Sequence, residues 1–288
     1  MRASIGITAL LWVQIVLYGF AGAARSEGLP PKQDGDRPVP NSPSPADRAN
    51  PDDRSLSLDE YIQSGVPASD RPWSGEDMAR AADRLMALAR QDQGKLPRFA
   101  SKRSGELFAR ITARKNLDLY RNRSLPLAAR LPDALKYTES LNQMAKTYLS
   151  SFLKGATGGG EVIELLGAEL RLMVVLMESI DEFLPTIPKD DPNYAVRMGG
   201  LRQMKEGLAT VVMGSLQTLT EKDTYRADER LKLLGYMKET IPAILPRLLP
   251  GTRKEFLQRV LGMAKDANLR ELQPALDDFT EGIRSGAD

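Results

Sequence analysis

The sequence predicts an all-α protein, built either as a multi-helix bundle or as a short array of helical hairpins with weak internal repeats. The first observation is Val162–Leu184, an apolar run with helical spacing whose polar residues fall into a narrow strip. The second is that similar segments follow one another from residue 73 onward, while alternating runs of β-branched residues, typical of strands, are missing. A helix that is apolar over most of its circumference needs neighbours on several sides, so we expect Val162–Leu184 at the centre of the domain.

The composition excludes several kinds of catalytic chemistry. The 288 residues include no cysteine and no histidine, which excludes disulfides, thiol nucleophiles, histidine-based triads, the usual zinc sites and histidine-ligated iron. The side chain that ordinarily changes its charge near neutral pH is therefore missing as well. With 40 basic and 38 acidic side chains the net charge is +2, so no overall argument for nucleic-acid binding remains.

Residues 1–24 have the order of an export signal. Arg2 precedes the apolar stretch Ile5–Phe20, and Ala21–Ala23 is a small-residue cleavage pattern. The alternative is an uncleaved membrane tether, because residues 3–24 carry no charge and approach the roughly 20 residues that span a bilayer. The small residues at the end favour cleavage. In either case we expect the body of the protein to be exported, as a periplasmic, secreted or N-terminally anchored protein.

Residues 25–72 are expected to form an extended, proline-rich linker. Between residues 25 and 54 prolines alternate with small, polar and charged residues, and large apolar residues are nearly absent. Such a stretch buries too little surface to offset the entropy lost on ordering. Further along, Ser57–Glu60 matches a capping box, which predicts a short helix over residues 57–64.

The all-helical domain is expected over residues 73–288. Ser74 is a suitable N-cap with Asp77 at the third helical position, and Trp73 can pack on Met78 across the cap. Apolar spacing and Gly or Pro punctuation predict the helices that follow. Their approximate ranges are 104–120, 132–154, 162–184, 192–219, 224–245, 250–264 and, more weakly, 269–283, with Pro132 at a first helical position and Pro242 bending or breaking its helix.

A leucine-proline spacing occurs three times in the helical region. In each copy a Leu-x-Leu is followed by Leu-Pro, whose leucine lies fourteen residues after the first one; the copies span 117–132, 170–185 and 231–246. We interpret them as repeats of a helical hairpin. Coincidence is the alternative, because leucine is abundant and proline commonly ends helices. The copies begin 53 and then 61 residues apart, which allows a compact bundle as well as an extended array.

The strongest charge anomaly lies between residues 95 and 123 and is called the basic segment below. Nine basic side chains face only two acidic ones, Glu106 and Asp118. The basic residues are Lys95, Arg98, Lys102, Arg103, Arg110, Arg114, Lys115, Arg121 and Arg123. One interpretation is a patch for an anionic partner, either a lipid surface, an acidic envelope polymer or an acidic protein. The favoured alternative is a solvated face whose charges meet acidic neighbours such as Asp277, Asp278 and Glu281.

Other short motifs are weak evidence for chemistry. The glycine-rich stretch Gly155–Gly160 precedes a helix, but the phosphate-loop lysine is missing and Glu161 places a negative charge where a phosphate would bind. Ser151–Lys154 has Ser-x-x-Lys spacing without its companion elements. The carboxylate pair Glu178 and Glu182 lacks the histidines of a di-iron site. We therefore expect no catalytic residues, metal or cofactor.

These observations favour an exported, non-catalytic helical protein that acts by binding, as a scaffold, adaptor or ligand carrier of the cell envelope. Its expected partner is an envelope protein or an anionic lipid or polymer, not nucleic acid. One alternative is a peripheral membrane protein that places a basic helix on anionic lipid. The other is a hydrolase that uses carboxylate or Ser–Lys chemistry.

Overall fold

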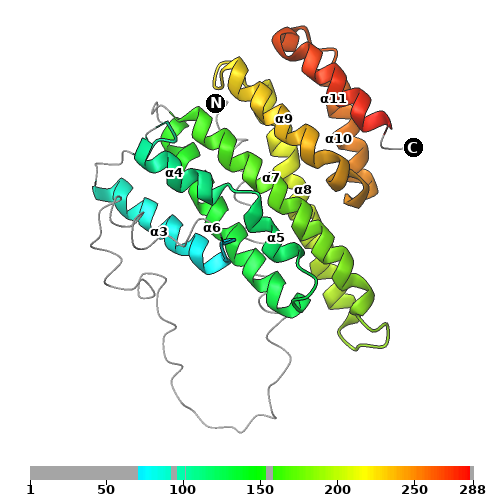
Figure 1. Ribbon diagram of the computed structural model, residues 1–288. Coiled ribbons are helices and arrows are strands. Elements are labelled where there is room, and N and C mark those ends of the chain that lie inside the picture. Colours follow the sequence, from blue (N-terminus) through cyan, green and yellow to red (C-terminus); the bar gives the residue numbers. More distant parts are fainter. Residues whose placement is uncertain (1–70, 92–95, 101, 154–157, 286–288) are drawn as a thin grey trace, which may run out of the picture.

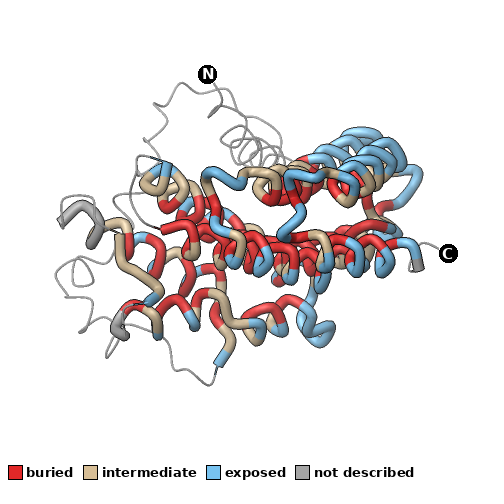
Figure 2. The backbone as a smooth tube through the Cα atoms, turned by 90° about the horizontal axis from the view of Figure 1, so that it is seen from above, coloured by how far each residue is buried: buried red, intermediate tan, exposed pale blue. Residues whose placement is uncertain are grey.

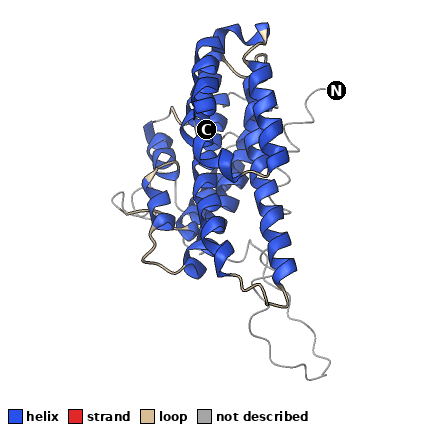
Figure 3. Ribbon diagram, turned by 90° about the vertical axis from the view of Figure 1, so that its right-hand side faces the viewer, coloured by secondary structure: helices blue, strands red, loops and turns tan. Residues whose placement is uncertain are grey.

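The computed structural model describes residues 71–91, 96–100, 102–153 and 158–285. The expected signal, most of the linker and the helix at 57–64 lie outside these residues. The described part is helical without strands and forms a multi-helix bundle, which confirms the predicted fold class (Figure 3). None of its helices is long and apolar enough to cross a membrane.

The helices follow the chain in a simple order. They are α3 (Gly75–Gln91), α4 (Lys102–Ile111), α5 (Lys115–Arg121), α6 (Leu127–Leu153), α7 (Gly159–Phe183), α8 (Tyr194–Thr220), α9 (Ala227–Ile244), α10 (Pro250–Met263) and α11 (Gln273–Ser285). Short 3-10 turns follow α7, α9 and α10, namely η4 (Leu184–Thr186), η5 (Leu245–Arg247) and η6 (Ala267–Leu272).

Helix α7 is the centre of the bundle, as its apolar circumference predicts. Helices α3, α6, α7, α9 and α11 pack in that order, while α8 contacts α7, α9 and α10, and α5 contacts α6 and α7 (Figure 1). Of the 25 residues of α7, 18 are buried. Figure 2 shows buried residues concentrated along the inner helices and exposed residues on the outer turns. Burial of apolar surface on several sides of one helix explains its richness in Leu, Val and Met.

The start of α3 confirms the predicted cap. The Ser74 backbone N–H donates to Asp77 Oδ2 at 3.0 Å, and the Asp77 N–H donates to Ser74 Oγ at 3.2 Å. This reciprocal pair satisfies two donors that an open helix end would leave without partners. Trp73 and Met78, on either side of the cap, are both in the buried core.

The single helix predicted over residues 104–120 is wrong, because the chain breaks between α4 and α5. The cause is Asn116, a fully buried side chain. Its Nδ2 donates to the Arg110 carbonyl at 2.7 Å, and its Oδ1 accepts from the Trp73 N–H at 3.0 Å. An asparagine that bonds nearby backbone competes with helix formation. The same side chain also links the junction between α4 and α5 to the residue before α3.

Two of the three leucine-proline copies have matching local structure, and the first does not. Helices α7 and α9 both end at a 3-10 turn with Pro at its second position, followed by a buried apolar residue, Ile187 or Leu248. In the first copy, by contrast, Pro132 is the sixth residue of α6 and not at a first helical position as predicted. Pro242 likewise lies within α9, which continues to Ile244.

Candidate functional site

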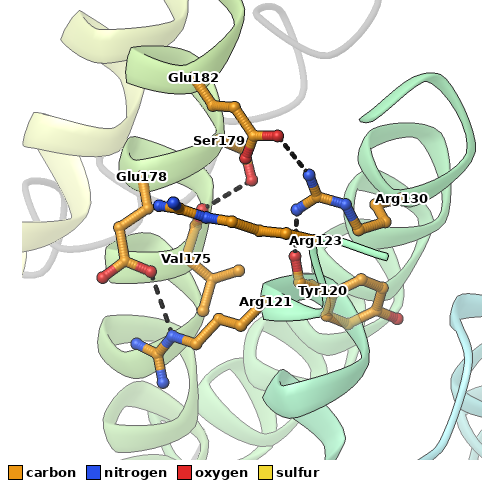
Figure 4. Close-up of a pocket in the computed structure, with 8 residues that line it drawn as sticks. All are labelled: Tyr120, Arg121, Arg123, Arg130, Val175, Glu178, Ser179 and Glu182. Atoms are coloured by element: carbon orange, nitrogen blue, oxygen red, sulfur yellow. Dashed lines mark hydrogen bonds and ion pairs between the residues drawn. The ribbon is translucent and has the colours of Figure 1, made fainter. Parts of the chain in front are cut away.

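A polar cleft lies between the end of α5, the start of α6 and the second half of α7 (Figure 4). It has a volume of about 240 Å³, and we call it the arginine cleft. Its lining residues are Tyr120, Arg121, Arg123, Arg130, Val175, Glu178, Ser179 and Glu182. Three guanidinium groups and two carboxylates line this cleft, so one positive charge remains unbalanced.

Arg130 is held rigidly at the base of this cleft. Its side chain is buried, and all three guanidinium nitrogens donate hydrogen bonds. Nη1 donates to the Tyr120 carbonyl at 2.6 Å, Nε to the Leu125 carbonyl at 3.0 Å, and Nη2 to Glu182 Oε1 at 2.5 Å. Arg130 thus joins the end of α5, the α5–α6 loop and α7. It shapes the cleft, and a ligand that replaced one of these acceptors would break a hydrogen bond of a buried group.

Arg121 has a weaker partner. Its Nε lies 3.1 Å from Glu178 Oε2, and the two side chains are 46% and 38% exposed. Exposed ion pairs of this kind contribute little stability, because water screens the charges and two long side chains lose freedom. A ligand carboxylate or phosphate that binds Arg121 therefore loses little by replacing Glu178.

Arg123 is the free cation of the cleft. It lies in the α5–α6 loop, is exposed, and makes no hydrogen bond or ion pair with any residue of the described chain. Figure 4 shows its side chain extending across the cleft toward the α7 side. Arginine presents a planar set of donors that matches the two oxygens of a carboxylate or phosphate. This side chain is free to bind such a group.

The cleft has no activated nucleophile. Ser179 donates its hydroxyl to the Val175 carbonyl of its own helix at 2.9 Å, a common local bond that occupies the proton. Among the residues that the structure describes, no group of three acidic residues is arranged to hold a metal ion. The Lys154 of the Ser-x-x-Lys motif lies outside the described residues. What the lining offers is recognition of an anionic group.

The structure divides the basic segment among several surroundings. Four of its arginines pair with glutamates: Arg98 with Glu161 at 2.8 Å, Arg110 with Glu106 at 2.6 Å, Arg114 with Glu239 at 2.8 Å, and Arg121 with Glu178. Two others, Lys115 and Arg123, make no ion pair with a described residue. Lys95 and the side chains of Lys102 and Arg103 lie outside the described part.

Two of the acidic residues that the sequence suggested as neighbours of the basic segment bond to other residues. Asp278 pairs with Lys238 of α9, and Asp277 accepts from Gln273 at 2.8 Å. The cleft combines Arg121 and Arg123 of the segment with Arg130, which sequence reasoning missed. Nothing in the local pattern around Arg130 distinguishes it from an ordinary surface arginine, since its partners come from α5, the loop and α7.

Carboxylates surround the N-terminus of α7, which follows the glycine-rich stretch. Glu161 is buried, and its Oε1 accepts from Arg98 Nε at 2.8 Å and from the Phe99 N–H at 3.0 Å. A second carboxylate, that of Glu229, lies where a Cβ on Gly159 would come within 2.8 Å of it. Two carboxylates at the N-terminus of α7 complement the helix dipole and leave no place for a phosphate.

Comparison with known proteins does not assign the chain to a family. No protein family, no characterised protein and no solved structure matches the chain. Its function has to be argued from its own residues.

Proposed function

We propose that this protein is a non-catalytic binding protein of the cell envelope, acting as a scaffold, adaptor or carrier, and that the arginine cleft receives an anionic group of its partner. The observation that carries the proposal is Arg123, a guanidinium at the cleft without a carboxylate partner in the described chain. The order of signal, linker and helical domain supports export. Measuring the intact mass of the exported protein tests the signal, since a retained Met1 would contradict cleavage.

The three arginines have different roles in the proposal. Arg130 is held by hydrogen bonds to two carbonyls and Glu182, so it keeps the cleft open at little further entropic cost when a ligand binds. Arg123 makes the first contact, and Arg121 follows by exchanging Glu178 for the ligand. Exposed Leu125 and Pro126 in the adjoining loop offer apolar contact to a larger partner.

A titration with simple anions tests this function. Inorganic phosphate and a short polyglutamate peptide are the probes, and amide chemical shifts are the readout. We expect shifts at residues 120–130 and 175–182, and about tenfold weaker binding in Arg123→Ala, which corresponds to the loss of one charged hydrogen-bonding group. The matched control is Arg259→Ala on α10, an exposed arginine 2.8 Å from Glu255. Equal binding by both variants, or no shifts at the cleft, would refute the proposal.

A peripheral membrane role is the second candidate. It is favoured by Lys115 and Arg123, which make no ion pair with a described residue, and by the exposed Leu125 in the same loop as Arg123. Binding to anionic lipid would then depend on both charges and on salt. Co-sedimentation with anionic and with neutral vesicles separates the two candidates. A membrane role predicts binding to anionic vesicles that is lost in the Lys115→Glu, Arg123→Glu double variant, whereas equal binding to both vesicle types excludes it.

A further inference from the structure

Glu169 is a buried carboxyl group in the middle of the central helix. Its side chain is 5% exposed, and neither carboxylate oxygen has a hydrogen-bond partner. Lys146 of α6, the helix that packs against α7, is close enough for its charge to act on this carboxyl group. One turn before Lys146, Asn142 is also buried, and its Oδ1 has no hydrogen-bond donor. Both α6 and α7 therefore carry buried acceptor atoms without a hydrogen-bond donor in the described chain.

An ionised carboxylate is poorly accommodated here. Removing its hydration without supplying hydrogen bonds strongly disfavours the charged form, so the group keeps its proton. Burial accordingly raises the pKa of Glu169 from 4.5 to about 8, although the positive charge of Lys146 lowers it. Burial also lowers the pKa of Lys146, while Glu169 raises it.

Several other charged residues on α7 and on the helices around it form ion pairs that do not involve Glu169. Lys232 of α9 pairs with Glu164, Arg171 with Glu239 of α9, and Lys205 of α8 with Asp181. On α5, Arg121 pairs with Glu178, while Lys115 and Asp118 make no ion pair with a described residue. Lys146 is the one charged group of the described chain whose field shifts the pKa of Glu169.

We propose that Glu169 makes the α6–α7 contact responsive to pH, closed and dry when the carboxyl is protonated and opened to water when it ionises. A histidine, the usual group for such a response, is missing from the sequence. The buried carboxyl supplies a charge change in the same range of pH. Because α6 also carries Arg130, opening of this contact would reach the arginine cleft, yet the inference does not depend on that site binding a ligand.

The sign of the effect follows from proton linkage. The folded state holds the Glu169 proton up to about pH 8, whereas the unfolded chain releases it near the ordinary pKa of 4.5. Stability from this group is therefore complete below the lower value and is lost as pH rises toward the higher one. Within this window each unit of pH multiplies the unfolding constant by up to about tenfold.

Denaturant unfolding of the full chain at several pH values tests the proposal. We expect the unfolding constant of the wild-type protein to rise across the window, and Glu169→Gln to remove that part of the rise. Glu169→Leu serves as a second neutral variant in case the glutamine amide is itself poorly accommodated. The control is Glu139→Gln, an exposed glutamate of α6, which should keep the wild-type slope. Identical slopes in the wild type and both Glu169 variants would overturn the proposal.

Hydrogen exchange of the wild-type protein tests the conformational part without any substitution. After correction for intrinsic exchange, the amides of α6 and α7 should lose protection between about pH 5 and about pH 8, while those of α11 change less. A uniform change over all helices would show global destabilisation without opening of this contact, and it would refute the proposed pH response. Unchanged protection of α6 and α7 would refute it as well.

Discussion

The ring of Tyr236 covers Gly167 so closely that a Cβ on this glycine would lie 2.3 Å from the ring. The tyrosine hydroxyl donates to Glu164 Oε2 at 2.5 Å, and the Arg171 guanidinium carbon lies 4.6 Å from the ring centroid. Arg171 also pairs with Glu239 at 3.1 Å. Helices α7 and α9 approach one another closely here, at a position where α7 has no side chain.

Gly167→Ala should therefore destabilise the bundle. Alanine is the better helix former by about 1 kcal/mol, but its methyl group displaces the Tyr236 ring, and overpacking of this kind costs about 1–3 kcal/mol. Urea unfolding measures the difference. The matched control is Gly235→Ala on α9, where a Cβ meets nothing within 4 Å; this variant should be neutral or slightly more stable. A Gly167→Ala variant at least as stable as Gly235→Ala would contradict the packing described above.

Leu172→Asp should prevent folding of the domain. Leu172 is 1% exposed on the central helix, and an aspartate there would leave a buried charge without a partner. Substitutions of this class cost at least about 4 kcal/mol, a large part of the stability of most domains. Circular dichroism and gel filtration provide the readout. Leu231→Asp, at a leucine that is 40% exposed on α9, is the control and should stay folded; a folded Leu172→Asp would show that α7 is not the core.

Asp133→Ala should weaken the attachment of α3 to α6. Both Asp133 carboxylate oxygens accept from the Gly75 N–H at 3.0 Å, and Oδ2 also accepts from the Tyr120 hydroxyl at 3.1 Å. Removing a helix cap costs about 1–2 kcal/mol. Thermal unfolding followed by circular dichroism measures the loss. Asp118→Ala on α5, an exposed aspartate, should change the midpoint much less, and equal losses would argue against a capping role for Asp133.

Asp77 should make the domain sensitive to acid. Burial alone would raise its pKa, but hydrogen bonds from Arg71, Ser74 and Arg80 outweigh burial and lower the pKa from 3.8 to about 2. Because the folded pKa lies below the unfolded one, this stability is present above about pH 4 and is lost as pH falls toward 2. It is on the order of 2 kcal/mol at most, since both arginines are about half exposed and water screens them. Asp77→Asn should be less stable near neutral pH and lose less stability in acid; a parallel pH profile would refute this assignment.

The local features of the fold were predictable from neighbouring residues. The cap at Ser74 depends on a residue three positions away, and the burial of α7 follows from its own apolar spacing. In each case the physical cause acts within a few residues of the chain.

The features that could not be predicted depend on residues far apart in the sequence. The break before α5 depends on Asn116, whose side chain bonds Trp73 from a distant part of the chain. The cleft depends on Arg130, whose partner Glu182 is likewise far away. A basic segment read along the sequence shows that charge is abundant but not which charges are paired. Of the basic side chains of that segment that the structure describes, only Arg121 and Arg123 line the cleft.

By itself the sequence determined that this protein is helical, which helix is central, and which histidine and cysteine chemistry it lacks. Periodicity, capping and composition are properties of adjacent residues, so they can be known before the chain folds. Only the tertiary structure decided that Tyr236 covers Gly167, and that neither Arg123 at the cleft nor the buried carboxyl group of Glu169 has a partner among the described residues. Close contacts, ion pairing and desolvation depend on how helices far apart in the sequence pack against one another, and the packing of the whole bundle sets those contacts.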